Sequence, residues 1–389
     1  MPAGLWGAAL THDNIINSYF SRRANYMTLI ARFFDRETIV YLGDILLSSK
    51  EEPLHSVSIP TADDINALMR PAAPPTFVVG TVQKVNLVND RLLFAWAGSY
   101  EQARSICQSL SSALEGGLAP ENIQDFILRE RPSFRDGVSL LGTAINIEGD
   151  TLRVHNFSYR SYRMGVPELR GDVAGTGSKS FVSLLTDMTQ GANAVRAVNQ
   201  GQNILNLGMS TSGVLTGNDM AFAAGIVAGW GGGFELAILS DKKKFKKISN
   251  IIHVPWEIVK NEQGLLILQM VPRIARYAYH GSNLIVKVLD LQKPDVADLA
   301  IHVVRPLLAE TEYIEPTPEP MHDFSYATLQ CHIRLPNGHV IQATFADAQG
   351  LNQINVKNVD GITKLSISPL LFGSIAEKVT KIFGQPVYG

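Results

Sequence analysis

The sequence is sparing in cysteine, in charge and in long apolar runs. Two cysteines, Cys107 and Cys331, occur in 389 residues, too few and too far apart to predict a disulfide framework or a zinc knuckle. Sparse cysteine is typical of a reducing compartment. No stretch approaches the ~20 apolar residues that a membrane helix needs, and the start of the chain lacks the basic lead of a secretory signal. We therefore expect a cytoplasmic protein with no membrane partner.

Charge is also scarce. Charged residues make up 18% of the chain and the formal net charge is −2, whereas nucleic-acid-binding domains are typically strongly basic, so we expect no nucleic-acid partner. The one basic run, Lys242 to Lys247, falls between two predicted strands, where a solvated turn is the simpler interpretation. The nine histidines include no closely spaced pair that would hold a metal ion, so the sequence predicts neither a metal nor a cofactor.

Apolar residues are abundant. They make up 46% of the chain, which is the composition of a globular protein with a large core. The length of 389 residues exceeds the usual size of one domain, so we expect two. Residues 1–27 are interpreted as an N-terminal extension or propeptide, residues 28–254 as one domain with an insertion at 45–79, and residues 255–389 as a β-rich accessory domain of unknown fold.

Within residues 28–254 the predicted elements come in blocks: strands, two helices, strands, two helices, strands. Alternating apolar residues indicate the strands, and apolar residues at helical spacing indicate the helices. This order predicts helices packed outside stacked antiparallel sheets rather than alternating βαβ units. The predicted strands include 28–34, 38–42, 81–88, 92–97, 138–148, 152–157, 234–239 and 245–253, and the helices are 100–114, 120–131, a long region after Ser178, and 220–230.

Three local features complete this prediction. Ser99 is a candidate N-cap for the helix at 100–114. Residues 201–217 are rich in Gly, Ser, Thr and Asn and are predicted to be a loop. After Pro255 we expect strands at 265–271, 284–291, 299–304, 327–334 and 339–345, followed by a terminal helix at 370–383.

The first predicted hairpin carries a recognisable pair of residues. Thr28 opens its first strand, and Asp44 closes the second at the end of Ile39-Val-Tyr-Leu-Gly-Asp44. The pair resembles the opening hairpin of proteasome β subunits and of the bacterial threonine peptidase rings, where a mature N-terminal Thr begins the first strand and an Asp closes the second. The resemblance implies a divergent N-terminal-nucleophile (Ntn) hydrolase with a C-terminal extension. It also implies that family's four-layer αββα sandwich, here joined to the β-rich accessory domain.

Three further segments follow in the order of that family. Thr81-Val-Gln-Lys-Val is similar to the strand with the catalytic lysine, which puts Lys84 in that place. Ala97-Gly-Ser resembles the turn whose backbone N–H is the oxyanion donor, which implies that role for Gly98. Gly175-Thr-Gly-Ser resembles the Gly-Ser-Gly turn beside the nucleophile, with Thr176 as the supporting residue. The implied catalytic residues are Thr28, Asp44, Lys84, Gly98 and Thr176.

The implied chemistry depends on the nitrogen of Thr28. A threonine hydroxyl is a weak nucleophile and needs a base close by. In the family that base is the α-amine of the threonine itself, and a lysine cation nearby favours the neutral amine. Here 27 residues precede Thr28, so its nitrogen is bound in a peptide bond. Cleavage after Met27, or a translation start at Met27 followed by removal of that methionine, would free it.

Two positions depart from the family pattern. Matching on the glycines at 231–233 puts Ala228 and Gly231 where the family carries a supporting Asp and Ser. Both side-chain partners are therefore expected to be missing. These departures favour an inactive member of the family, whereas the order of Thr28, Asp44 and Lys84 favours an active one.

Two functions therefore stay open. The first is a threonine-type peptidase or amidohydrolase acting on a peptide or protein substrate. The second is a catalytically silent scaffold or assembly subunit. Taken singly, each of Thr28, Asp44 and Lys84 is better explained by a structural role, as a β-branched strand residue, a hairpin cap and a solvated lysine respectively. Only their joint order supports the first function. Members of the family stack into rings through their outer helices, which implies a homo-oligomer in either case.

Overall fold

Most of the protein is β-sheet in the computed structural model. Of the described residues, 47% lie in strands and 28% in helices. The described residues are 28–34, 38–49, 51–53, 57–62, 77–130, 137–166, 169–190, 201–227, 230–239, 243–271, 273–290, 298–308, 328–336, 340–346, 354–359 and 362–388.

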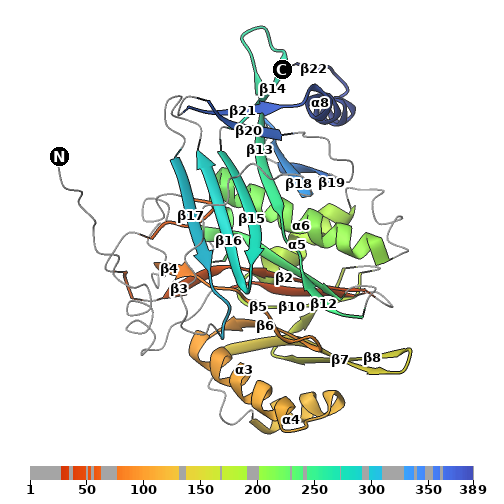
Figure 1. Ribbon diagram of the computed structural model, residues 1–389. Helices are drawn as coiled ribbons and strands as arrows, with labels where there is room; N and C mark the ends of the chain where they lie inside the picture. The colour runs from red at the N-terminus through yellow and green to blue at the C-terminus, as the bar shows by residue number, and fades with distance from the viewer. Residues whose placement is uncertain are drawn as a thin grey trace, which may run out of the picture.

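Two antiparallel sheets form the N-terminal part of the protein (Figure 1). One has the strand order β12-β11-β2-β1-β10-β9 and the other β5-β6-β7-β8. Alternating apolar residues put Ile30 and Tyr41 of the first sheet and Leu93 and Leu141 of the second into one shared cluster. The strands are β1 (Ile30–Phe34), β2 (Ile39–Asp44), β5 (Val85–Asn89), β6 (Leu92–Gly98), β7 (Val138–Glu148), β8 (Thr151–Tyr159), β9 (Tyr162–Arg163), β10 (Gly171–Ala174), β11 (Phe234–Leu239) and β12 (Phe245–Lys247).

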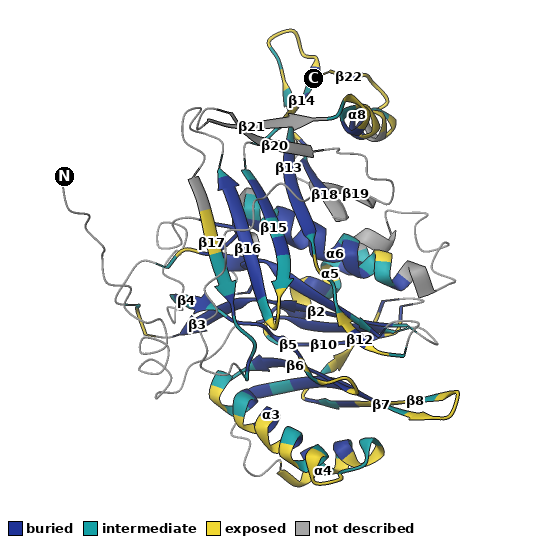
Figure 2. Ribbon diagram, viewed as in Figure 1, coloured by how far each residue is buried: buried dark blue, intermediate teal, exposed yellow. Residues whose placement is uncertain are grey.

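Helices α3 (Tyr100–Glu115) and α4 (Ile123–Glu130) cover the outer face of the four-stranded sheet, and the 3-10 turn η1 (Pro120–Asn122) leads into α4. Their apolar sides pack against β6 and β7, while their other sides face solvent, as Figure 2 shows in yellow. The Oγ of Ser99 accepts a hydrogen bond from the Gln102 N–H at 3.4 Å, so the predicted N-cap is confirmed.

Helix α6 (Gly201–Phe222) lies between the six-stranded sheet and a third, eight-stranded sheet. Together with α5 (Ser178–Gln190) it shares one core with β1 and β2 and with Tyr277 and Val286 of the third sheet. The Gln330 side-chain amide donates to the carbonyl oxygen of Met209 at 2.8 Å, which ties α6 to that sheet. Its strands are β13 (Ile251–Lys260), β14 (Leu266–Met270), β15 (Arg273–His280), β16 (Asn283–Asp290), β17 (Asp298–Val304), β18 (Thr328–Arg334), β19 (Val340–Ala346) and β22 (Val387–Tyr388).

The expected four-layer αββα sandwich with a β-rich accessory domain is wrong. Strand outweighs helix by 47% to 28%, and α6 is not an outer layer because the eight-stranded sheet covers it. The prediction fails because the alternation of apolar and polar residues identifies a strand but does not show which other element the strand packs against. One core cluster joins residues on both sides of residue 254, among them Phe33, Met209 and Val288.

The prediction of a loop at residues 201–217 is also wrong, because these residues belong to α6. The small residues that suggested a loop allow close packing on both sides of a buried helix. A Cβ on Gly208 would lie 2.7 Å from Val40 Cγ1, and a Cβ on Gly217 would lie 2.7 Å from His332 Cβ. The hydroxyl of Thr216 donates to the carbonyl of Ser212 at 2.8 Å, so this polar group is satisfied inside the helix.

Most other predictions of elements are confirmed. Strands β7 and β11 have the predicted bounds, and the terminal helix is α8 (Pro369–Phe383). The segment 245–253 is not one strand but β12 and the start of β13, and β15 was not predicted. The helix predicted at 220–230 is also wrong, because α6 ends at Phe222 and the short helix α7 ends at Val227. The shorter elements are β3 (Leu46–Ser49) paired with β4 (Phe77–Thr81), β20 (Ile354–Val359) paired with β21 (Ile362–Ile367), and α7 (Ala224–Val227). Within the described ranges, no helix combines the length and the apolar character needed to cross a membrane.

Candidate active site

Thr28 lies two residues before β1 and is fully buried. Its hydroxyl donates to Asp44 Oδ1 at 2.9 Å. Its backbone N–H donates to the hydroxyl oxygen of Thr176 at 3.0 Å, and its carbonyl oxygen accepts from the Gly177 N–H at 3.3 Å. The structure therefore brings Thr28, Asp44 and Thr176, which are widely separated in the sequence, into direct hydrogen-bonded contact.

The Asp44 side chain is held at the end of β2 by two backbone N–H groups besides the Thr28 hydroxyl. Its Oδ1 also accepts from the Leu29 N–H at 3.3 Å, and its Oδ2 accepts from the Gly231 N–H at 3.0 Å. Burial raises the pKa of Asp44 to about 6, although the charge of Lys84 and these hydrogen bonds act in the opposite direction. The carboxylate thus has a fixed orientation and a pKa close to neutrality.

Lys84 is the buried cation of the site and immediately precedes β5. Burial lowers its pKa to about 8, and the charges of Asp44 and then Glu235 oppose that shift. Its ammonium lies 4.1 Å from the ring centroid of Trp96, a cation–π contact that replaces part of its hydration. The charges of Lys84 and Asp44 therefore act on each other inside the protein.

Glu235 is a charged neighbour of the site that sequence reasoning missed. Its buried carboxylate accepts from the Val85 N–H at 2.7 Å and from the Tyr279 hydroxyl at 2.9 Å, and it forms an ion pair with Lys247. The only signal in the sequence is a single acidic residue in the apolar strand Phe234–Leu239, which is unusual because buried acids are normally paired. Lys247, interpreted above as part of a solvated turn, is that partner.

The glycines around Thr28 and Gly98 allow close backbone approach. Gly175 has φ +98°, and a Cβ there would lie 2.1 Å from the Thr28 carbonyl oxygen and 3.3 Å from the Ala97 Cβ. Gly98 follows Ala97 with φ +100°, and a Cβ on it would lie 1.8 Å from the Gly137 carbonyl oxygen. Only glycine fits at either position. Gly98 thus lies beside the turn that packs on Thr28, and its role as oxyanion donor stays a prediction.

Of the two positions that depart from the family pattern, the structure describes one. Gly231 contributes its backbone N–H to Asp44 instead of a side chain. Ala228 lies outside the described residues. A second buried carboxylate, Asp219 of α6, accepts from the Gly232 N–H at 3.0 Å and therefore holds the same turn.

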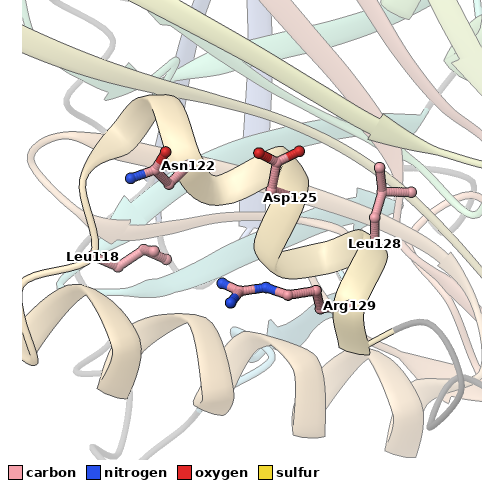
Figure 3. Close-up of a pocket in the computed structure, with 5 residues that line it drawn as sticks. All are labelled: Leu118, Asn122, Asp125, Leu128 and Arg129. Atoms are coloured by element: carbon pink, nitrogen blue, oxygen red, sulfur yellow. The ribbon is translucent and has the colours of Figure 1, made fainter.

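The part of the chain that the structure describes holds no metal site beside Thr28. No group of three or more His, Cys, Asp or Glu residues there could hold a metal ion. A surface pocket at α4 is drawn in Figure 3, and none of its lining residues touches Thr28 or Asp44. The lining residues are Leu118, Asn122, Asp125, Leu128 and Arg129.

The arrangement of Thr28, Asp44 and Lys84 is that of a hydroxyl with an acceptor and a nearby cation. Such a group can act as a nucleophile once a base can take its proton. A scan against protein-family models and a search of curated proteins both find no match to this chain.

Proposed function

We propose that the chain is a latent threonine-type peptidase or amidohydrolase, related to the Ntn hydrolases through its site, with Thr28 as the nucleophile. The observation that carries the proposal is the 2.9 Å hydrogen bond from the Thr28 hydroxyl to Asp44, whose charge is coupled to that of Lys84. A hydroxyl, a carboxylate and an ammonium buried together are costly unless they are mutually paired, which favours a functional site over an incidental core contact.

The site is latent because the nitrogen of Thr28 is an amide. An amide N–H donates a hydrogen bond, here to Thr176 at 3.0 Å, but it cannot accept a proton. Removal of residues 1–27 would convert it to an α-amine, whose pKa is ordinarily about 7.7–8.0. A positive charge at Lys84 favours the neutral amine, which is the form that acts as a base.

The reaction then follows from the position of each group. The Thr28 Oγ forms a bond to the substrate carbonyl carbon while its proton passes to the freed α-amine. The oxyanion is stabilised by a backbone donor, which we assign to the N–H of Gly98. The amine returns the proton to the leaving nitrogen as the C–N bond breaks, and water hydrolyses the ester left on Thr28.

The test is covalent labelling of Thr28. The chain is produced in full length and as a form that begins at Thr28, which keeps every described element. Both are treated with a peptide epoxyketone and analysed by intact mass and peptide mapping. We expect labelling of Thr28 only in the shortened form, and none in its Thr28→Ala variant. A correctly folded shortened chain that stays unlabelled would contradict the proposal.

A catalytically silent scaffold is the second candidate, favoured by one observation. Thr28 is 0% exposed and Lys84 1% exposed, so neither side chain is in contact with solvent in the full-length chain. N-terminal sequencing of the protein from its native host separates the candidates, because a chain that always begins before Thr28 would favour the scaffold.

We also propose that copies of the chain associate in the cytoplasm through the solvent-facing sides of α3 and α4. The exposed outer surface of these helices supports this (Figure 2). Light scattering tests it, and a strict monomer over a wide concentration range would contradict it.

A further inference from the structure

A glycine turn, Gly231 to Gly233, holds Asp44 by its backbone. The Gly231 N–H donates to Asp44 Oδ2 at 3.0 Å, and the carbonyl of Gly231 accepts from the Leu46 N–H at 3.1 Å. The three glycines have φ values of +112°, +74° and +120°, which residues with side chains rarely adopt. The orientation of Asp44 therefore depends on the contacts that hold this glycine turn in place.

Asp219, in the last turn of α6, is the side chain that spans the two ends of the segment before β11. Its Oδ1 accepts from the Gly225 N–H at 2.8 Å and its Oδ2 from the Gly232 N–H at 3.0 Å. The residue is 2% exposed, so water does not substitute for these partners. One carboxylate oxygen thus holds Gly225 and the other holds Gly232, which is the residue next to Gly231.

The Asp219 carboxylate also fills the space that a side chain at position 231 would need. A Cβ on Gly231 would lie 2.1 Å from Asp219 Oδ2, and a Cβ on Gly225 would lie 2.5 Å from Asp219 Oδ1. Position 231 is where the family resemblance implies a supporting serine. The Asp219 carboxylate therefore occupies the space that a side chain at position 231 would take.

We propose that Asp219 is a positioning residue of the Thr28 site, which holds the Gly231 N–H against Asp44 and so replaces the support that position 231 lacks. Its link to catalysis rests on the proposed function, whereas its hold on Asp44 does not. Burial raises the pKa of Asp219 to about 7, and the charge of Asp44 adds to the shift while backbone N–H groups oppose it. Among the described residues, Lys84 and Tyr277 are the other titratable groups whose charges act on this pair. The charge of Glu235 also acts on Lys84, and that of Arg273 acts on Tyr277.

The decisive variant is Asp219→Asn. Asparagine has one oxygen and one NH2 group, so either the Gly225 N–H or the Gly232 N–H would face another donor in any rotamer. Thr216→Ala is the matched control, because it removes a buried polar group one turn earlier in α6 whose bond stays inside the helix.

The first measurement is a double-mutant cycle of Asp219→Asn and Asp44→Asn in the full-length chain, followed by denaturant unfolding. We expect the two effects to depart from additivity by about fivefold or more in the unfolding equilibrium constant, as for residues that belong to one hydrogen-bond network. Additivity within about twofold would overturn the inference. This result does not depend on whether Thr28 is ever active.

The second measurement is the rate at which a peptide boronate labels the chain that begins at Thr28, as a function of pH. We expect Asp219→Asn to slow labelling and shift its pH midpoint, and Thr216→Ala to leave both unchanged. An Asp219→Asn variant with the rate and midpoint of the unsubstituted chain would overturn the inference. If the unsubstituted chain is not labelled, the proposed function fails and the double-mutant cycle alone decides the role of Asp219.

If Asp219→Asn does not fold, the unsubstituted full-length chain provides the test. The amide protons of Gly225, Gly231 and Gly232 should be protected from hydrogen exchange to the same extent, because the two carboxylates hold them in one turn. Fast exchange at Gly231 beside a protected Gly232 would overturn the inference.

Discussion

At the scale of single residues, the charge states of the site are set by a few buried ionisable groups. Asp44 and Lys84 are both buried, and burial shifts the pKa of the carboxyl up to about 6 and that of the ammonium down to about 8. Both groups are therefore charged only within a narrow range around neutral pH. Glu235 is the second anion that acts on Lys84, and its own hydrogen bonds to Val85 and Tyr279 fix its place.

Replacing Lys84 by methionine tests this balance. Without the cation only the hydrogen bonds to Asp44 oppose the effect of burial, so the pKa of that carboxyl should rise further and the neutral Thr28 amine should lose its support. We expect Lys84→Met to slow epoxyketone labelling of the chain that begins at Thr28 by about 100-fold or more, as for loss of a group that assists proton transfer. Lys246→Met, at an exposed position of β12, is the control and should label normally. Equal rates for both variants would contradict the role of Lys84.

At the scale of elements, the contact of α6 with the eight-stranded sheet holds a pair of buried histidines. His253 Nδ1 and His332 Nε2 lie 2.9 Å apart, linking β13 to the parallel strand β18. Burial lowers the pKa of both, that of His332 to about 3 and that of His253 well below its ordinary value, which the neighbouring His332 charge lowers further. The folded protein therefore keeps both rings neutral where the unfolded chain would bind protons.

The pH dependence of stability follows from this difference. Above pH ~6.5 both histidines are neutral in the folded and in the unfolded chain. Below that pH the histidines of the unfolded chain are protonated while those of the folded chain stay neutral, so the free energy of unfolding falls by about 1.4 kcal/mol per pH unit for each ring. Asp44 and Asp219, with raised pKa values, act with the opposite sign. The comparison is therefore between the protein and its His332→Gln variant.

We expect the free energy of unfolding of His332→Gln, measured by denaturant titration between pH 6.5 and 4.5, to fall less with acidification than that of the unsubstituted chain. His280→Gln, at an exposed residue of β15, should match the unsubstituted curve. Parallel curves for all three proteins would show that the histidine pair does not control acid stability.

At the scale of the whole molecule, one apolar cluster extends from β1 across α6 to β16 and β17. The eight-stranded sheet therefore covers surface that the N-terminal sheets and helices would otherwise expose. A second cluster, between α8 and strands β13 and β14, contains Leu371, Ile375 and Val379 but no residue of the first. The two clusters predict different outcomes for two truncations.

A chain that ends at residue 250 loses every element from β13 to β22, including α8, and exposes the far side of α6. We expect it to aggregate or to bind a hydrophobic dye, because burial of apolar surface is worth about 25 cal/mol per Å2 and that contribution is lost. A chain that ends at residue 368 loses only α8 and β22 and should keep the cooperative unfolding of the N-terminal part. Cooperative, dye-free folding of the shorter chain would show instead that residues 28–250 are an independent domain.

The sequence by itself determined the strands and helices with clear periodicity, such as β7, α3 and its Ser99 cap, because those patterns depend on neighbours along the chain. It also pointed to Thr28, Asp44 and Lys84, whose order along the chain is visible without any fold. Only the tertiary structure decided that 201–217 is a buried helix, that a third sheet covers it, and that Glu235 and Asp219 face the site. These features depend on contacts between segments that are far apart in the sequence. Small residues that pack against another sheet produce no periodic pattern of apolar residues, so the sequence does not reveal that packing.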